Sequence, residues 1–430
     1  MLGVGLAIAV SSVVGYLLLA LIGRALSPED FGLFVSYWGV LFGLASSLST
    51  IEQEAAKQSA EGATAGRAPI HRVAISAAVI ATAAAALTLL PPVAERLYGE
   101  ADSRLGVLVV LATLGFAVQF MVRGLLMGND RIPAYSGIVI AEAAVRLLVL
   151  LAVWVTVGVT LGTAAAAVAV GSYAWIGWIR QARRVDRREA GPAATSTGWR
   201  APFARAGSLM LAAALMACMI TGYPTMVTAF SGGTLGVEGG IVFAALTVSR
   251  VPLLFVAPLQ ALAVPTIVAW RQDPTKTTHD SRRLLVLGAL GVLGIALVGA
   301  VAAWFVGPWG VQLAYGANYV VAPEAVAGLV FSACVLGLLQ LMSAALVAFG
   351  SYRWMIVVWG VSVATTAVWL LLSPLDIVAS TVVGAVLGPV AGSVLALTTL
   401  WRLAGQDVPA PATATSFPDS GGPAVGPEDA

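Results

Sequence analysis

Two ionisable side chains stand four residues apart inside a long apolar run. Glu142 and Arg146 are the only charged residues between positions 134 and 157. At this spacing two side chains share one face of a helix, so they can form an intrahelical ion pair that neutralises both. The other interpretation is a binding site, because an arginine carries a fixed charge and several donors suited to phosphate oxygens. The sequence leaves both interpretations open.

Arg250 has no such partner on its own helix. It lies in the apolar run 238–268, and no acidic residue stands three or four positions away. A buried arginine without a counter-ion needs water, a neighbouring helix or an anionic ligand. Arg250 is therefore the strongest single candidate for binding an anionic group. The alternative is that its long side chain reaches toward the membrane interface.

Further charged candidates stand near the ends of apolar runs. Arg24 is expected at an outer helix end and Arg123 at an inner one, where an arginine serves as an interfacial anchor or as a ligand for an anion. Glu52 and Glu54 mark the inner end of the run 31–51. Together with Glu142 they are candidates for coupling to a proton or a sodium ion. The alternative for Glu52 and Glu54 is a solvated helix end.

The elements that must position these residues are membrane-spanning helices. Of the 430 residues, 59% are hydrophobic and only 10% are charged, whereas a soluble domain carries roughly 25% charged residues. A spanning helix needs roughly 20 apolar residues. The sequence therefore predicts an all-α integral membrane protein with about twelve transmembrane helices. The predicted spans are 2–25, 31–51, 73–93, 105–127, 134–157, 160–179, 206–230, 238–268, 284–307, 323–348, 351–372 and 376–401.

Prolines interrupt two of the predicted spans. Pro224 lies in the seventh, and Pro252, Pro258 and Pro265 lie in the eighth. Proline lacks the backbone donor and its ring clashes with the preceding turn, so these positions predict bends. Bent helices beside a cavity are candidate hinges; the alternative is that the bends serve packing alone.

The basic residues predict an orientation. Apart from Arg146 and Arg250, which lie within spans, nearly all Lys and Arg fall in alternate connections, and only Arg24, Arg96 and Arg104 fall in the others. Cytoplasmic loops carry the excess of basic residues in membrane proteins. Both termini are therefore predicted to be cytoplasmic, with an even number of helices.

The two halves of the chain share features at matching places. Tyr98-Gly99 recurs as Tyr315-Gly316, and the spacing of Gly128 and Arg131 recurs in Gly350 and Arg353. These matches predict a duplicated six-helix unit in parallel orientation. The predicted domains are a first lobe (1–180), a basic cytoplasmic linker (181–205), a second lobe (206–402) and a disordered cytoplasmic tail (403–430). Transporters built from parallel repeats bind substrate between the halves near the midplane.

The sequence contains no motif for chemistry of other kinds. It has no nucleotide-binding glycine loop, no nucleophile motif and no metal-ligand spacing, and both histidines fall in polar loops. We therefore expect no catalytic residue, no metal, no cofactor and no nucleic-acid partner.

The run from Arg24 to Gly32, Arg-Ala-Leu-Ser-Pro-Glu-Asp-Phe-Gly, resembles the first-loop pattern of the polysaccharide flippase family. That family belongs to the multidrug/oligosaccharidyl-lipid/polysaccharide exporter superfamily. Further similar segments are Arg123 to Gly128 followed by Tyr135, Glu142 and Arg146, then Arg250-Val251-Pro252 with Pro265, and Tyr315-Gly316. The similarity covers residues 1–402. In place of the basic residue that peptidoglycan-precursor flippases carry near the end of their second helix, this chain has Glu52-Gln53-Glu54, which weakens that assignment.

The resemblance implies a flippase that moves a polyprenyl-pyrophosphate-linked oligosaccharide across the bacterial cytoplasmic membrane by alternating access. Its implied partners are membrane lipids, this lipid-linked substrate and the polysaccharide synthesis machinery. One alternative is a multidrug and toxin exporter of the same superfamily, which would need acidic residues inside the lobes. Another is an enzyme, a membrane glycosyltransferase or polysaccharide polymerase. Such enzymes usually have a sizeable outer loop, whereas the predicted outer loops 94–104 and 308–322 are short.

Overall fold

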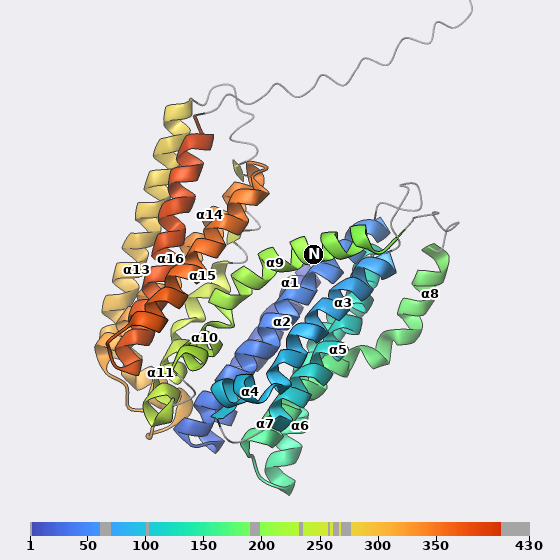
Figure 1. The fold of residues 1–430 in the computed structure, drawn as a ribbon, viewed down its shortest axis with the longest axis horizontal. Coiled ribbons are helices and arrows are strands. Elements are labelled where there is room, and N and C mark those ends of the chain that lie inside the picture. The colour runs from blue at the N-terminus through green and yellow to red at the C-terminus, as the bar shows by residue number, and fades with distance from the viewer. Residues whose placement is uncertain are drawn as a thin grey trace, which may run out of the picture.

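The computed structural model describes residues 2–60, 70–99, 103–189, 198–231, 235–256, 259–260, 266–267 and 277–405. Within these ranges the chain forms helices joined by short connections and contains no β-strand (Figure 1). Twelve of the described helical segments are long and apolar enough to cross a membrane. The prediction of an all-α, multi-pass membrane protein with twelve spans is confirmed.

The first half of the chain forms one group of helices. Its α-helices are α1 (Leu2–Ala25), α2 (Pro28–Ala60), α3 (Ile70–Ala86), α4 (Pro91–Tyr98), α5 (Ser103–Gly128), α6 (Ile132–Thr156), α7 (Leu161–Val170) and α8 (Ile179–Glu189). The 3-10 segments η1 (Leu87–Leu89) and η3 (Gly171–Trp178) connect α3 to α4 and α7 to α8. In this group α2 packs along α5, and α1 packs along α6. These four helices carry most of the charged candidates.

The second half forms the helices α9 (Arg200–Ile220), α10 (Tyr223–Phe230), α11 (Gly236–Ser249), α13 (Thr278–Tyr315), α14 (Pro323–Ala348), α15 (Tyr352–Leu372) and α16 (Ile377–Leu403), with the 3-10 segment η4 (Val251–Phe255) after α11. Figure 1 shows α13 to α16 together on one side of the molecule and α2 to α8 on the other. The helices α9, α10 and α11 lie between them, and both α9 and α11 pack against α2. The duplication of a six-helix unit and the orientation in the membrane stay predictions.

Several predicted boundaries are wrong, and prolines account for three of them. The ninth span continues to Tyr315 with Pro308 inside the helix, because a membrane helix tolerates proline where neighbouring groups satisfy the freed backbone. The seventh span is interrupted at Thr221 and Gly222, and Pro224 then lies in the first turn of α10. The eighth ends its α-helical part at Ser249 and continues from Val251 as the 3-10 segment η4, with Pro252 in its first turn. A first-turn position suits proline because its missing donor has no partner there.

The remaining differences concern connections. The sixth span was expected as one α-helix over 160–179 but changes to 3-10 helix at Gly171. The third ends in η1, and Pro91 begins the separate short helix α4. The expected linker 181–205 is helical at both ends, through α8 and α9. Pro258, Pro265 and the tail from position 406 lie outside the described residues.

Candidate functional site

A cavity of about 630 Å³ lies between the two halves of the chain. Helices α1, α2, α5 and α6 line it from the first half, and α9, α10, α11 and η4 line it from the second. The cavity brings together four of the charged candidates, Arg123, Glu142, Arg146 and Arg250, and one predicted hinge residue, Pro224. These residues come from both halves of the chain, and the fold gives them one common space.

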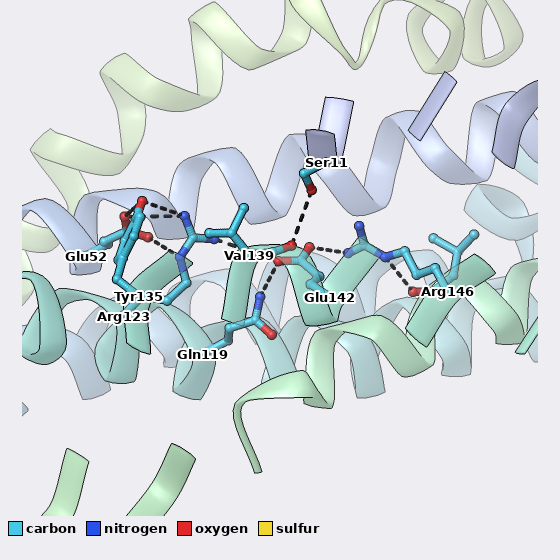
Figure 2. A network of polar contacts seen from close by, with 9 residues as sticks. Ser11, Glu52, Gln119, Arg123, Tyr135, Val139, Glu142 and Arg146 are labelled. Carbon is cyan, nitrogen blue, oxygen red and sulfur yellow. Dashed lines mark hydrogen bonds and ion pairs between the residues drawn. The ribbon is translucent and has the colours of Figure 1, made fainter. Parts of the chain in front are cut away.

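Glu142 and Arg146 form the intrahelical ion pair that their spacing allows. Arg146 Nη2 binds Glu142 Oε1, and the two side chains are only 9% (Arg146) and 12% (Glu142) exposed. The second carboxylate oxygen, Oε2, accepts a hydrogen bond of 2.6 Å from Gln119 Nε2 and lies 3.8 Å from Arg123 Nη1 (Figure 2). Both oxygens of Glu142 are therefore occupied by donors from α5 and α6.

Other groups also fix the position of Arg146. Its Nε donates to the backbone carbonyl of Val168 at 3.2 Å. Its guanidinium group lies 4.9 Å from the ring centre of Phe42 and 5.7 Å from that of Phe116, distances at which a cation is attracted by an aromatic face. A Cβ atom at Gly171 would lie 2.5 Å from Arg146 Cγ and Nε. The glycine at the start of η3 thus provides the space in which this arginine lies.

A second cluster lies beside the first and includes Glu52, Arg123 and Tyr135 (Figure 2). Arg123 Nε is 3.0 Å from Glu52 Oε2. The Tyr135 hydroxyl donates to Glu52 Oε1 at 2.8 Å and accepts from Arg123 Nη2 at 3.0 Å. Charges therefore alternate along the wall of the first half, from Glu52 through Arg123 and Glu142 to Arg146.

Glu52 and Glu54 are not at a solvated helix end, and that alternative is wrong for both. Helix α2 continues past them to Ala60, and their side chains are 13% and 8% exposed. Glu54 Oε1 lies 2.7 Å from Arg205 Nη2 and accepts from Gln58 Nε2 at 2.5 Å. Glu54 does not line the cavity; it joins α2 to α9 instead.

Arg250 binds the end of a neighbouring helix. Its guanidinium group donates to the backbone carbonyl of Ile220 and, at 3.2 Å, to that of Met219, both in the last turn of α9. The carboxyl end of a helix carries partial negative charge. No carboxylate of the described residues pairs with Arg250. The sequence left open whether water, a neighbouring helix or an anionic ligand satisfies Arg250. In the structure a neighbouring helix, α9, does so, and the Arg250 side chain also lines the cavity.

Arg24 binds a helix end in the same way but elsewhere. Its Nε donates to the carbonyl of Ala314 at 2.9 Å, and its Nη2 binds the carbonyl of Leu313, in the last turn of α13. The side chain is exposed and does not line the cavity. The structure therefore separates Arg24 from the other arginine candidates.

Gln119 and Tyr135 are site residues for which no role in binding was predicted. Gln119 is fully buried and donates to Glu142, while Tyr135 connects Glu52 with Arg123. The sequence feature that could have indicated Gln119 is an amide inside an apolar run, because a buried polar side chain needs a hydrogen-bond partner. The partner itself, on another helix, was not visible in the sequence.

Comparison with known proteins places the chain among mycobacterial relatives. No known family model matches it. The uncharacterized protein Rv3630 of Mycobacterium tuberculosis and the uncharacterized protein Mb3654 of Mycobacterium bovis are each 30% identical to it over 412 residues, which cover 93% of this chain and 91% of each relative. The uncharacterized protein Rv1510 of Mycobacterium tuberculosis is 28% identical over 420 residues. The chain belongs to the family of these mycobacterial proteins.

Solved structures show which fold this chain has. An inward-facing multidrug resistance MATE family transporter of the MOP superfamily aligns with a TM-score of 0.67 at 13% identity, covering 90% of this chain and 94% of that chain. A MOP superfamily transporter from Pyrococcus furiosus gives 0.59 at 14% identity, covering 94% and 95%. The Vibrio cholerae MATE transporter VcmN in the bent form gives 0.55 at 16%, also covering 94% and 95%. This multi-pass membrane protein has the MOP superfamily fold, as the sequence resemblance implied.

Proposed function

We propose that this protein exports a polyprenyl-pyrophosphate-linked oligosaccharide, a precursor of cell-surface polysaccharide, across the bacterial cytoplasmic membrane by alternating access. The observation that carries the proposal is the charge of the cavity between the two halves. Three guanidinium groups, of Arg123, Arg146 and Arg250, and one carboxylate, of Glu142, come from the described residues that line it. An excess of arginine at a membrane-embedded site suits a phosphate-bearing head group.

The size of the cavity indicates which part of the substrate enters. At about 630 Å³ it has the volume of a pocket for a drug-sized ligand, enough for the pyrophosphate and the nearest sugar. The polyprenyl tail would stay in lipid beside α1. This helix faces the cavity with Ser11, Ser12 and Tyr16, while Val13 and Leu17 are exposed at 65% and 47%.

The membrane potential favours this direction of transport. Moving a negative charge outward across an inside-negative membrane releases roughly 2.3 kcal/mol per charge per 100 mV. The cost to be overcome is the lost hydration of the pyrophosphate, and the arginine side chains would offset it. Neither step requires a nucleotide.

The interrupted helices on the second-half wall are the elements that would change shape. The break between α9 and α10 at Thr221 and Gly222 and the change from α11 to η4 at Arg250 both lie beside the cavity. Pro224 and Pro252 are the second residues of the segments after these breaks, so we assign them as hinges. Rocking of the halves about these points would expose the cavity to each side in turn.

Export of cationic drugs is the second candidate function, and Glu142 is the observation that favours it. A buried carboxylate inside the cavity can hold a cation or a proton. The fold also resembles a multidrug resistance transporter. However, the reverse polarity of the binding pocket in the Pyrococcus furiosus transporter suggests a different function for that member of the superfamily. Three arginines beside one glutamate likewise favour an anionic substrate here.

The deciding experiment depletes the protein in cells and follows lipid-linked oligosaccharide in each leaflet. Accumulation on the cytoplasmic face, reversed by re-expression, is the expected result. Loss of oligosaccharide assembly itself would instead indicate the glycosyltransferase or polymerase. An unchanged distribution of lipid-linked oligosaccharide between the leaflets, together with lost efflux of cationic dyes, would indicate the multidrug exporter. Either of these two results, the enzyme's or the multidrug exporter's, would overturn the proposal. Synthesis enzymes are the expected partners and would be recovered by cross-linking.

A further inference from the structure

We propose that Glu142 is an internal counter-anion that occupies the anion-binding position of Arg146, so that a phosphate-bearing head group binds only by displacing this carboxylate. The inference rests on the proposed function and adds a competition within the same cavity. Its first support is that Glu142 is the only carboxylate among the described residues that line the cavity. Its Oε1 atom is bound to Arg146 Nη2 there.

Arg146 is held in place without help from Glu142. The carbonyl of Val168 accepts from its Nε, the rings of Phe42 and Phe116 lie against its guanidinium group, and Gly171 leaves space for its methylene groups. Removal of Glu142 would therefore leave the guanidinium group where it is, with Nη2 free to donate. A phosphate oxygen uses the same donors in the same geometry as a carboxylate oxygen.

The other two arginines do not offer such an exchange. The carboxylate that neutralises Arg123 belongs to Glu52, which is also held by Tyr135 and does not line the cavity. Arg250 is bound to backbone carbonyls, which carry no formal charge and cannot leave the helix end singly. Glu142 also lies 3.8 Å from Arg123 Nη1, but Glu52 still neutralises Arg123 when Glu142 is displaced. Among the three, Arg146 alone depends for its counter-charge on a carboxylate that lines the cavity.

An exchangeable counter-anion serves a carrier that must return empty. In alternating access the empty protein changes conformation with its arginines still inside the membrane, where an uncompensated charge is strongly unfavourable. Glu142 neutralises Arg146 in that state. A neutral sugar gains nothing by displacing Glu142, whereas a pyrophosphate replaces it with more than one negative charge. The competition therefore makes the site selective for strongly anionic head groups.

Calorimetric titration of purified protein with inorganic pyrophosphate tests this competition. Glu142→Gln keeps the shape of the side chain but removes its charge and replaces one of its two accepting oxygens with an amide donor, and we expect it to tighten pyrophosphate binding about tenfold or more. Glu54→Gln is the matched control, because Glu54 is also a buried carboxylate paired with an arginine but lies outside the cavity. Its affinity for pyrophosphate should equal that of the wild type. Glu142→Asp provides a second variant, since the shorter side chain withdraws the carboxylate from Arg146 and should also tighten binding.

The outcomes separate this inference from the function on which it rests. If the wild type binds pyrophosphate and both Glu142 variants bind it equally well or more weakly than the wild type, then Glu142 positions Arg146. That result would refute the competition. If Glu54→Gln gained as much affinity for pyrophosphate as Glu142→Gln, the gain would come from the total charge of the protein. That result would also refute the competition. Absence of binding by wild type and by every folded variant would refute the anionic head group itself. Binding by Glu142→Gln alone would support the inference most strongly.

Discussion

The two walls of the cavity compensate their arginines in different ways. On the first-half wall, Arg123 and Arg146 face carboxylates, and the contacts run between side chains on α2, α5 and α6. On the second-half wall, Arg250 faces backbone carbonyls at the end of α9. A carboxylate can be displaced by another anion without a change of backbone. A helix end can exchange its partner only if the helix or the arginine moves.

Under the proposed function, this difference would divide the work of transport between the walls. The first wall would recognise charge, because Glu142 would compete directly with a substrate anion. The second wall would connect binding to conformation, because the carbonyls that Arg250 caps belong to the turn beside the break at Thr221 and Gly222. A phosphate that draws Arg250 away would release the end of α9 next to a predicted hinge. Substitutions on both walls should therefore have strong effects, with different readouts.

The largest effect is expected for Arg250→Glu. A carboxylate at this position would face the carbonyls of Met219 and Ile220 and would repel a pyrophosphate. We expect export in the leaflet assay to fall at least a hundredfold, with the protein level in membranes unchanged. Arg353→Glu is the control, because Arg353 is exposed at the start of α15 and does not line the cavity. Wild-type export by the Arg250 variant would remove this residue from the site.

An intermediate effect is expected for Gly171→Ala on the first wall. The added Cβ would overlap with Arg146 Cγ and Nε, so the guanidinium group must leave its place between Phe42 and Phe116. Overpacking of this kind costs roughly 1–3 kcal/mol of stability. Pyrophosphate binding, measured by calorimetry, should weaken about tenfold. Gly177→Ala in the same 3-10 segment is the control, since a Cβ there meets no atom within 4 Å. Equal affinity of the two variants would show that Arg146 does not contact the ligand.

The sequence was informative about the helices and about one of the contacts. The apolar runs predicted twelve spans, because lipid forces each backbone segment to satisfy its own hydrogen bonds. The spacing of Glu142 and Arg146 allowed their ion pair, because it is local. The partners of Arg123 and Arg250 were not predictable, because they lie on other helices. Arg250 required in addition that α9 end at Ile220; Pro224 predicted a bend in this span, but not which side chain would bind the carbonyls at the helix end.

The smallest effect on binding is expected for Arg24→Gln. This variant tests whether an arginine at a helix end affects binding only when it also lines the cavity. Arg24 caps the last turn of α13 with two carbonyl contacts, just as Arg250 caps α9, but it is exposed and lies outside the cavity. Loss of these contacts should lower the free energy of unfolding by about 1 kcal/mol. The affinity for pyrophosphate should stay within about twofold of wild type in the same titration. Arg250→Gln is the matched substitution at the cavity and should be measured in the same titration. If Arg24→Gln weakened pyrophosphate binding as much as Arg250→Gln, the arginine contacts to helix ends would affect binding only through stability. The second wall would then have no specific connection between the substrate and α9.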